Sequence, residues 1–265
     1  MTTGQTMTTG QTAAHVFVDD LERPELSPPD AHHLGRVLRL RRGELVSASD
    51  GEGAGRLCRW TGAASLEKVG AVARSARPLP VLTVAVALTK GARTEWAVQK
   101  LTEAGVDRVV LMTSERCVVR WVADSEERHL QHLRSVARQA AMQSRRVWLP
   151  AVEGPARFGS VVAGGDREAA EPGTGAGRSD QGVALATPGG SPLTLATPTV
   201  LVGPEGGWAD AELAAVERHA GVGPHILRSE TAALAAGVLL AALRAGLVAP
   251  GAPAPAGRPV EPGGP

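Results

Sequence analysis

The strongest constraint on this fold is a regular alternation of strand-length apolar runs with helical patterns, which starts at residue 81. The first run, VLTVAVALTK, precedes a helical pattern from about Thr94 to Ala104, and Gly105 is a suitable helix stop. A second run, DRVVLM, precedes the helical pattern SEERHLQHLRSVARQAAMQS. Apolar runs of this length are typical of strands buried on both faces of a parallel sheet. The alternation therefore predicts an α/β fold with a parallel sheet.

The same alternation continues toward the C-terminus. The runs VALAT and TVLVG predict two more strands, followed by a helix from about Asp210 to His219, a short strand in HILRSE and a long Ala/Leu helix. The apolar stretch of that last helix, from Ala232 to Leu243, is shorter than the ~20 residues that a membrane span needs. We therefore expect a buried helix and no membrane partner.

The region before residue 81 has a different pattern. HVFVDD and ELVSASDG alternate as strands do, a short helix is expected at about 33–40, and Asp50-Gly51 is a turn signal. The sequence thus predicts a small β-rich module at 15–77, joined by a Pro-rich linker to the α/β domain at 81–249.

Three segments lack the composition of a packed structure. The stretches at 1–14 and 250–265 are predicted to be disordered tails, and the first of them has neither the basic region nor the apolar core of a signal peptide. The Gly-rich, acidic segment at 164–182 is predicted to be a mobile surface loop.

Charge and cysteine content narrow the class of protein only a little. The formal net charge is +1, but residues 31–77 carry nine Lys/Arg against four Asp/Glu, a net of +5. Such a stretch binds a phosphate backbone or is simply a solvated basic face, and composition does not separate the two. Cys58 and Cys117 are too few for a disulfide framework and suit a reducing cytoplasm. His129 and His132 form a surface pair rather than a zinc site, so no metal is expected.

The sharpest local signal is the sequence TVLVGPEGGWADAEL, in which a β-branched run ends abruptly at 203–207. In open α/β sheets, ligands bind beyond the carboxyl ends of the strands, and glycines there let the backbone approach a ligand. The segment is not a P-loop, because no Gly-Lys-Ser/Thr follows, and it is not a GxGxxG fingerprint. A ligand loop and a plain strand–helix turn both remain open on this motif alone.

Further motifs place polar groups near the same edge of the sheet. HILRSETAAL leads into the last helix, with Ser229 as a candidate N-cap beside free N–H groups. Lys90 and Arg93 follow the first strand, and Arg116 follows the second. Each group also fits a solvated surface, which is the ordinary interpretation of a polar helix face.

Together these motifs resemble the RsmE family of 16S ribosomal RNA uridine methyltransferases, within the SPOUT superfamily. The pieces that carry the resemblance are, in order, HHLGRVLRLRRGELVSASDG, KGARTEWAVQKLTEAGV, SERC, QSRR, LVGPEGGWADAE and ILRSETAAL. They span roughly residues 15–245. Each motif is weak alone, but six in one order are specific.

The resemblance implies a SPOUT-type parallel sheet with a C-terminal trefoil knot, and an N-terminal PUA-like β-barrel that binds RNA. It implies a cytoplasmic homodimer that uses S-adenosylmethionine to methylate N3 of one specific uridine of 16S rRNA in the small ribosomal subunit. The cofactor would be held by three loops, whose residues are Leu185, Ala186, Thr187, Val202, Gly203, Pro204, Gly206, Gly207, Ile226, Leu227, Ser229 and Thr231.

The chemistry of the implied reaction suggests further residues. Uridine N3 must lose a proton, and an arginine fork suits the flanking O2 and O4 atoms. We assign Arg93, Arg116 and Arg228 to RNA or uridine contacts, and Glu205 or Glu230 to the position nearest the reacting centre. Contacts to the RNA backbone are predicted for Arg36, Arg39, Arg41, Arg42, Lys90 and Arg146.

Four positions depart from the pattern of the family that the chain resembles. His15 stands where an Arg is usual, Met142 where a Glu is usual, Arg145 where a Gly is usual, and Ala104 where a Leu is usual, the last a loss of packing only. The first change puts one RNA contact in doubt. Alternative functions are methylation of another RNA or of a ribose 2′-OH, a non-catalytic RNA-binding relative, and a small-molecule α/β enzyme with a nucleotide at the Gly-rich turn.

Overall fold

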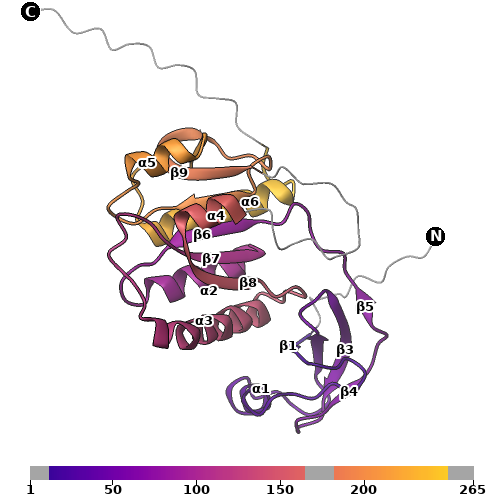
Figure 1. The fold of residues 1–265 in the computed structure, drawn as a ribbon. Helices are drawn as coiled ribbons and strands as arrows, with labels where there is room; N and C mark the ends of the chain where they lie inside the picture. Colours follow the sequence, from indigo (N-terminus) through magenta and orange to yellow (C-terminus); the bar gives the residue numbers. More distant parts are fainter. Residues whose placement is uncertain (1–11, 165–181, 250–265) are drawn as a thin grey trace, which may run out of the picture.

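Two β-sheets organise the chain, and they lie at opposite ends of the ribbon in Figure 1. The structure is a computed structural model that describes residues 12–164 and 182–249. The loop predicted at 164–182 falls, except for its end residues, outside the described residues, as do 1–11 and 250–265 of the two predicted tails. The first strand begins at Ala14, the last residue of the predicted N-terminal tail.

The first sheet has five strands and a core of its own. Its order is β1-β2-β3-β4, with β5 also paired to β3; β1 and β2 are parallel and the other pairs antiparallel. Val16, Val46 and Trp60 are among the side chains buried in its core, and Leu34 from the neighbouring helical segment joins them. The elements of this region are β1 (Ala14–Phe17), α1 (Pro28–His32), a single wide helical turn η2 (His33–Val37), β2 (Leu45–Ser49), β3 (Ala54–Trp60), β4 (Leu66–Lys68) and β5 (Ala73–Arg74).

The second sheet has six strands, all parallel, in the order β11-β9-β10-β6-β7-β8. The strand–helix alternation thus gives the parallel α/β fold that it predicts. The elements are β6 (Thr83–Ala87), α2 (Arg93–Ala104), β7 (Arg108–Thr113), α3 (Ala123–Gln143), β8 (Ala151–Arg157), α4 (Phe158–Gly164), β9 (Val183–Pro192), β10 (Thr199–Val202), α5 (Asp210–Ala215), β11 (Arg218–Gly221) and α6 (Ser229–Arg244).

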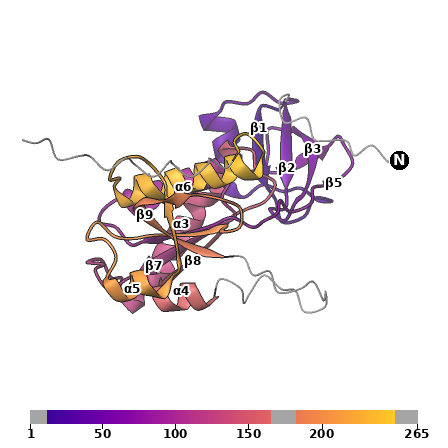
Figure 2. The same ribbon diagram turned by 90° about the horizontal axis from the view of Figure 1, so that it is seen from above.

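Helices cover both faces of this sheet, as Figure 2 shows. The core on one face combines β-strand residues with side chains from α2, α3 and α6, and the core on the other face contains side chains from α4 and α5. Strands β6 and β10 are buried along their whole length, which explains why all their residues after the first threonine are apolar. Within the described residues, no helix has the length and apolarity to cross a membrane.

The small residues of α6 bring it very close to α2. A Cβ atom at Gly237 would lie 2.7 Å from Leu101 Cδ2 and 2.9 Å from Val106 Cγ2, so this position has no room for a side chain. Helix α2 ends at Gly105, which adopts a left-handed conformation (φ 97°) and donates its N–H back to the last turn, as the sequence predicts.

Two local predictions near the C-terminus are wrong. The helix expected from Asp210 to His219 ends at Ala215, because the chain turns into the edge strand β11. The strand expected in HILRSE is absent: residues 225–228 form an irregular loop before α6. Pairing with β9 explains both differences, since the partner of a strand cannot be read from local sequence.

The two sheets dock through specific contacts rather than through a bare linker. Arg138 of α3 donates to both carboxylate oxygens of Asp30 (3.0 and 2.7 Å) and to the carbonyl of Phe17 (3.1 Å). A Cβ at Gly53, whose φ is +93°, would lie 2.3 Å from the ring of Trp148, so glycine is required at this contact. The first module is therefore held against α3 and the segment that precedes β8.

Candidate active site

A pocket of about 160 Å³ lies beyond the carboxyl end of β10, beside the middle of β9 and the N-terminus of α6. The loops that follow β10 and β11 meet there against β9, and the pocket is open to solvent. The loop that the sequence predicts at 185–187 is a correction, because these residues lie within β9. It is lined by Ala186, Thr187, Pro188, Val202, Gly203, Pro204, Glu205, Gly207, Trp208, Val222, Gly223, His225, Ile226, Leu227, Ser229 and Ala232. The pocket occupies the place where open parallel sheets bind ligands.

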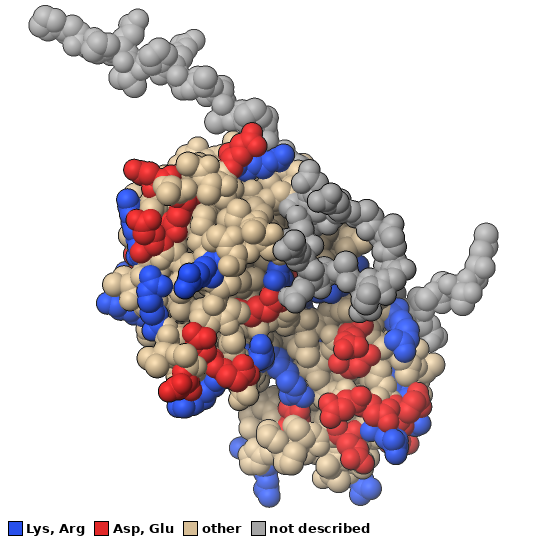
Figure 3. All heavy atoms as spheres, in the orientation of Figure 1, with Lys and Arg blue, Asp and Glu red and all other residues tan. Residues whose placement is uncertain are grey.

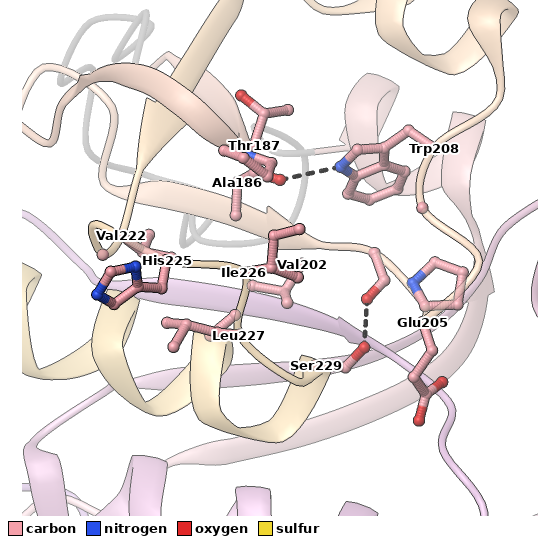
Figure 4. A pocket seen from close by; sticks show the side chains of 16 residues that line it. Ala186, Thr187, Val202, Glu205, Trp208, Val222, His225, Ile226, Leu227 and Ser229 are labelled. Carbon is pink, nitrogen blue, oxygen red and sulfur yellow. Dashed lines mark hydrogen bonds between the residues drawn. The ribbon is translucent and has the colours of Figure 1, made fainter.

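Two hydrogen bonds join the loop after β10 to β9 and to the start of α6 (Figure 4). The Ser229 hydroxyl donates to the carbonyl of Gly203 at 2.6 Å, and the Trp208 indole N–H donates to the carbonyl of Ala186 at 3.1 Å. Ser229 is therefore not the N-cap that the sequence predicts: Arg228 occupies that position, with no side-chain cap. The serine joins the start of α6 to the loop after β10 instead.

The glycines of the loop after β10 are required by geometry. A Cβ at Gly203 would lie 3.0 Å from the Trp208 ring, so only glycine lets the indole pack over this backbone without displacement. Gly207 has a φ of +72°, and its N–H donates to the carbonyl of Pro204 at 2.9 Å, closing a tight turn. The motif is thus both a turn and part of the pocket wall.

Two of the arginines assigned to RNA lie against the same loop. Arg93, at the start of α2, forms an ion pair with Glu205, and Arg116, after β7, donates to the carbonyl of Gly206 at 3.3 Å. Figure 4 shows the Glu205 side chain directed away from the other labelled residues. Glu205 is 45% exposed, so it lacks the burial that a general base at this position requires.

Glu230 is a better candidate for proton removal than Glu205. Its Oε2 atom is one of the few buried side-chain oxygens without a hydrogen-bond partner in the described part of the chain. It lies in the first turn of α6, next to Ser229 and Arg228. Arg228 is exposed, so its side chain is accessible to a large substrate.

Sequence reasoning missed Glu212, which connects two loops of the site. Its carboxylate is buried (7% exposed) and accepts from the backbone N–H of Ala209 (3.0 Å) and of Glu115 (2.9 Å). The first bond caps α5, and the second fixes the loop that carries Arg116. The position of Glu212 three residues after Ala209 is a helix-start signal, but no sequence signal indicates the bond to Glu115.

Most of the residues predicted to hold the cofactor do line the pocket. Three do not: Leu185 is fully buried beneath it, Gly206 contacts Arg116, and Thr231 is exposed on α6. The lining residues that sequence reasoning missed are Pro188, Trp208, Val222, Gly223, His225 and Ala232. Val222, Gly223 and His225 belong to the loop after β11, a strand that the sequence did not reveal.

The predicted RNA-binding cations divide into two groups. The exposed ones are Arg36, Arg39, Arg41, Arg42 and Lys90. Arg146 is a correction: its guanidinium is 13% exposed and donates to the carbonyls of Thr102 and Val106, beside the buried carboxylate of Asp107. This arginine holds the end of α3 against the end of α2 and is not available to RNA. On the face shown in Figure 3, charges of both signs are interspersed.

Three of the four departures from the family pattern, His15, Met142 and Arg145, lie at one cavity between the modules. His15 is buried and hydrogen-bonded through Nδ1 to the Ser47 hydroxyl at 2.8 Å, and Arg145 bonds the Thr12 hydroxyl and carbonyl. Met142 lies beside them in the wall of the same cavity. Within the described ranges, no group of three His, Cys, Asp or Glu side chains is arranged to hold a metal ion.

Fold and pocket together define the class: an α/β protein with a parallel sheet and a loop-built ligand pocket at the carboxyl ends of its strands. A family model described as RNA methyltransferase domain matches residues 76–241. The ribosomal RNA small subunit methyltransferase E of Mycobacterium bovis is 34% identical over 227 residues, which cover 78% of this chain and 81% of the relative. This chain therefore belongs to the ribosomal RNA small subunit methyltransferase E family, as the six motifs indicate.

Solved structures agree on the fold. A probable rRNA-methyltransferase from Porphyromonas gingivalis matches with a TM-score of 0.68 at 25% identity, covering 89% of this chain and 100% of its own. The ribosomal RNA small subunit methyltransferase E of Neisseria gonorrhoeae, whose structure contains S-adenosyl methionine, matches with a TM-score of 0.69 at 23% identity, covering 88% of this chain and 97% of its own.

Proposed function

We propose that this protein transfers the methyl group of S-adenosylmethionine to N3 of one specific uridine of 16S rRNA in the small ribosomal subunit. The observation that carries the proposal is the meeting of two loops with strand β9 at one pocket, in a chain of this family. The two loops, at 203–207 and 226–229, are joined by the hydrogen bond from Ser229 to Gly203.

The residues present suit this cofactor. Val202, Leu227 and Ala232 give the pocket an apolar wall for a flat heterocycle, and the surrounding loops bring backbone groups near polar atoms. The Trp208 ring packs directly on the backbone of Gly203, so that a Cβ atom at position 203 would displace this part of the pocket wall. When bound, S-adenosylmethionine supplies an electrophilic methyl group on a positively charged sulfur.

The side chains around the pocket suit the uridine. N3 lies between two carbonyl oxygens, and a guanidinium presents several N–H donors in one plane, so Arg116 or Arg228 would stabilise charge that develops on O2 and O4. Arg93 would hold the loop through Glu205 and add positive charge at the rim. Glu230 would accept the N3 proton through its unpartnered oxygen. Fixing these groups before the substrate arrives would supply much of the acceleration.

The architecture that we propose follows from the family. The module at 15–77 is a PUA-like barrel, the domain at 81–249 contains a C-terminal trefoil knot, and the protein is a cytoplasmic homodimer. Helix α6, which packs closely against α2 at Gly237, would be the threaded element. Exposed apolar side chains near the C-terminus, Val238 (48%), Leu239 (36%) and Leu247 (79%), support a partner surface.

The proposal is tested with small ribosomal subunits from a strain that lacks its own enzyme. Incubation with the purified protein and S-adenosylmethionine should yield 3-methyluridine in 16S rRNA, measured by mass spectrometry of nucleosides. Glu230→Gln should slow a single turnover, and Glu205→Gln should have a smaller effect. A methylated ribose, or no methylated nucleoside, would contradict the proposed reaction.

A further inference from the structure

A second and larger cavity, of about 600 Å³, lies between the first module and α3. Its volume is within the ~300–1,000 Å³ range of ligand pockets. It is lined by Ala13, Ala14, His15, Pro29, Asp30, His33, Leu34, Leu38, Gln139, Met142, Gln143 and Arg145. It shares no residue with the pocket beside α6, so it is a separate site.

The lining combines apolar and amide side chains. Leu34, Leu38 and Met142 provide apolar surface, and Leu38 remains 44% exposed. Gln139 and Gln143 are exposed and lie four residues apart on α3, so their amides are on one face of the helix. An amide offers both donors and an acceptor, which matches the mixed donors and acceptors on the edge of a nucleobase.

The charge around this cavity suits a polyanion. His33, Leu34 and Leu38 belong to the segment that also carries the exposed Arg36 and Arg39. One acidic side chain lies in the wall, Asp30, and both of its oxygens accept hydrogen bonds from Arg138. The segment that contributes these lining residues thus carries two exposed cations, and the carboxylate in the wall is paired with Arg138.

The backbone is also unusual at this place. Among the residues that the structure describes, two that are not glycine have a positive φ: Arg39 (53°) and Arg145 (57°). Arg145 lines the cavity and Arg39 follows Leu38, which also lines it. Non-glycine residues in this conformation are costly and cluster at binding sites. The strain is thus confined to the border of one cavity.

We infer that this cavity receives one unpaired nucleobase of the substrate RNA, while the arginines at 36–42 hold the neighbouring phosphates. Recognition of single-stranded RNA commonly separates a base from its neighbours and reads its edge with hydrogen bonds. The inference rests on the proposed RNA substrate. It adds a second anchoring point for the RNA, separate from the pocket beside α6.

The test compares a double variant, Gln139→Ala with Gln143→Ala, with the control Gln131→Ala, an exposed glutamine on the same helix outside the cavity. The probe is a single-stranded RNA copied from the methylated region of 16S rRNA, together with versions in which one abasic nucleotide is moved along the strand. Affinity is measured by fluorescence anisotropy at several salt concentrations.

The double variant should bind the intact RNA about tenfold more weakly than the wild type, with an unchanged salt dependence, because the lost contacts are to a base and not to phosphate. The wild type should lose a similar factor on one abasic RNA. The two losses should not add, because they remove the same contact. Gln131→Ala should bind as the wild type does.

Equal affinity of the double variant and the wild type for intact RNA would overturn the inference, and so would the absence of any sensitive abasic position. A reduced salt dependence would assign the cavity to phosphate and also overturn it. Methylation by the wild type is measured in parallel. If methylation occurs without a sensitive base, the cavity inference alone fails; if a sensitive base is found without methylation, the proposed reaction alone fails.

Discussion

The two cavities of this protein are built in different ways. The pocket beside α6 is made by part of β9, two loops and the start of α6, all within 186–232, and side chains of these segments donate hydrogen bonds to one another's backbone. The cavity beside α3 combines residues 13–38 with residues 139–145, and the ion pair between Arg138 and Asp30 joins the two segments next to it. The pocket beside α6 therefore forms with the parallel sheet alone. The cavity beside α3 exists only when the core of the first module docks against the α/β domain.

This difference predicts that acid will weaken the second region more than the first. Burial, aided by the nearby charge of Arg145 and opposed by the carbonyl of Arg146, lowers the pKa of His15 to about 4. The unfolded chain takes up this proton near pH 6.5, so the stabilisation is complete above that pH and is lost as pH falls toward 4. The loss should approach about 3 kcal/mol, measured by urea unfolding at pH 7.5 and 4.5.

The variant His15→Leu should lose little stability between these two pH values. His225→Leu, which changes an exposed histidine of the other pocket, should lose as much as the wild type. The same acid response in all three proteins would show that His15 is not the group responsible.

Glu212 tests the first region, because it joins the loop of Arg116 to the start of α5. Glu212→Ala should lower the rate of methyl transfer about 100-fold through misplacement of Arg116, with a much smaller change in the Kd for S-adenosylmethionine. The rate for Glu212→Gln, which keeps one acceptor oxygen, should lie between the rates for Glu212→Ala and the wild type. Glu217→Ala is the exposed control. A rate within threefold of the wild type for Glu212→Ala would refute the positioning role.

The next largest effect is expected on stability and RNA affinity, from breaking the ion pair between Arg138 and Asp30. Arg138→Ala leaves the Asp30 carboxylate, 8% exposed, without its cation and should cost about 2 kcal/mol, less than a fully buried pair because Arg138 is 33% exposed. RNA affinity should fall, while cofactor affinity stays unchanged. Arg128→Ala, an exposed arginine on the same helix, is the control. Equal loss of both affinities would mean that the two cavities are not independent.

The smallest effect concerns the bond between two cofactor loops. Ser229→Ala removes the donor to the Gly203 carbonyl and should weaken S-adenosylmethionine binding about fivefold, or ~1 kcal/mol. Thr231→Ala, two residues further along α6, should bind normally, because Thr231 is exposed and does not line the pocket. Calorimetric titration of both variants makes the comparison.

The pocket beside α6 could be predicted in part from the sequence, whereas the cavity beside α3 could not. The parallel sheet and the loop at 203–207 were visible because apolar runs and glycines act locally. Strand β11 cannot be predicted in this way, because it forms by pairing with β9, which is distant in sequence. The assignments of Ser229 as a cap and Arg146 as an RNA contact were wrong for a related reason: each side chain bonds a segment far away in sequence. The second cavity had no sequence signal at all.

The central claim is that the pocket beside α6 holds S-adenosylmethionine, and hydrogen–deuterium exchange tests it most directly. Adding the cofactor should slow amide exchange at 185–187, 203–207 and 226–231, and leave 29–38 and 139–145 unchanged. Protection at the cavity beside α3, or no protection in the three segments of the pocket at saturating cofactor, would contradict the account.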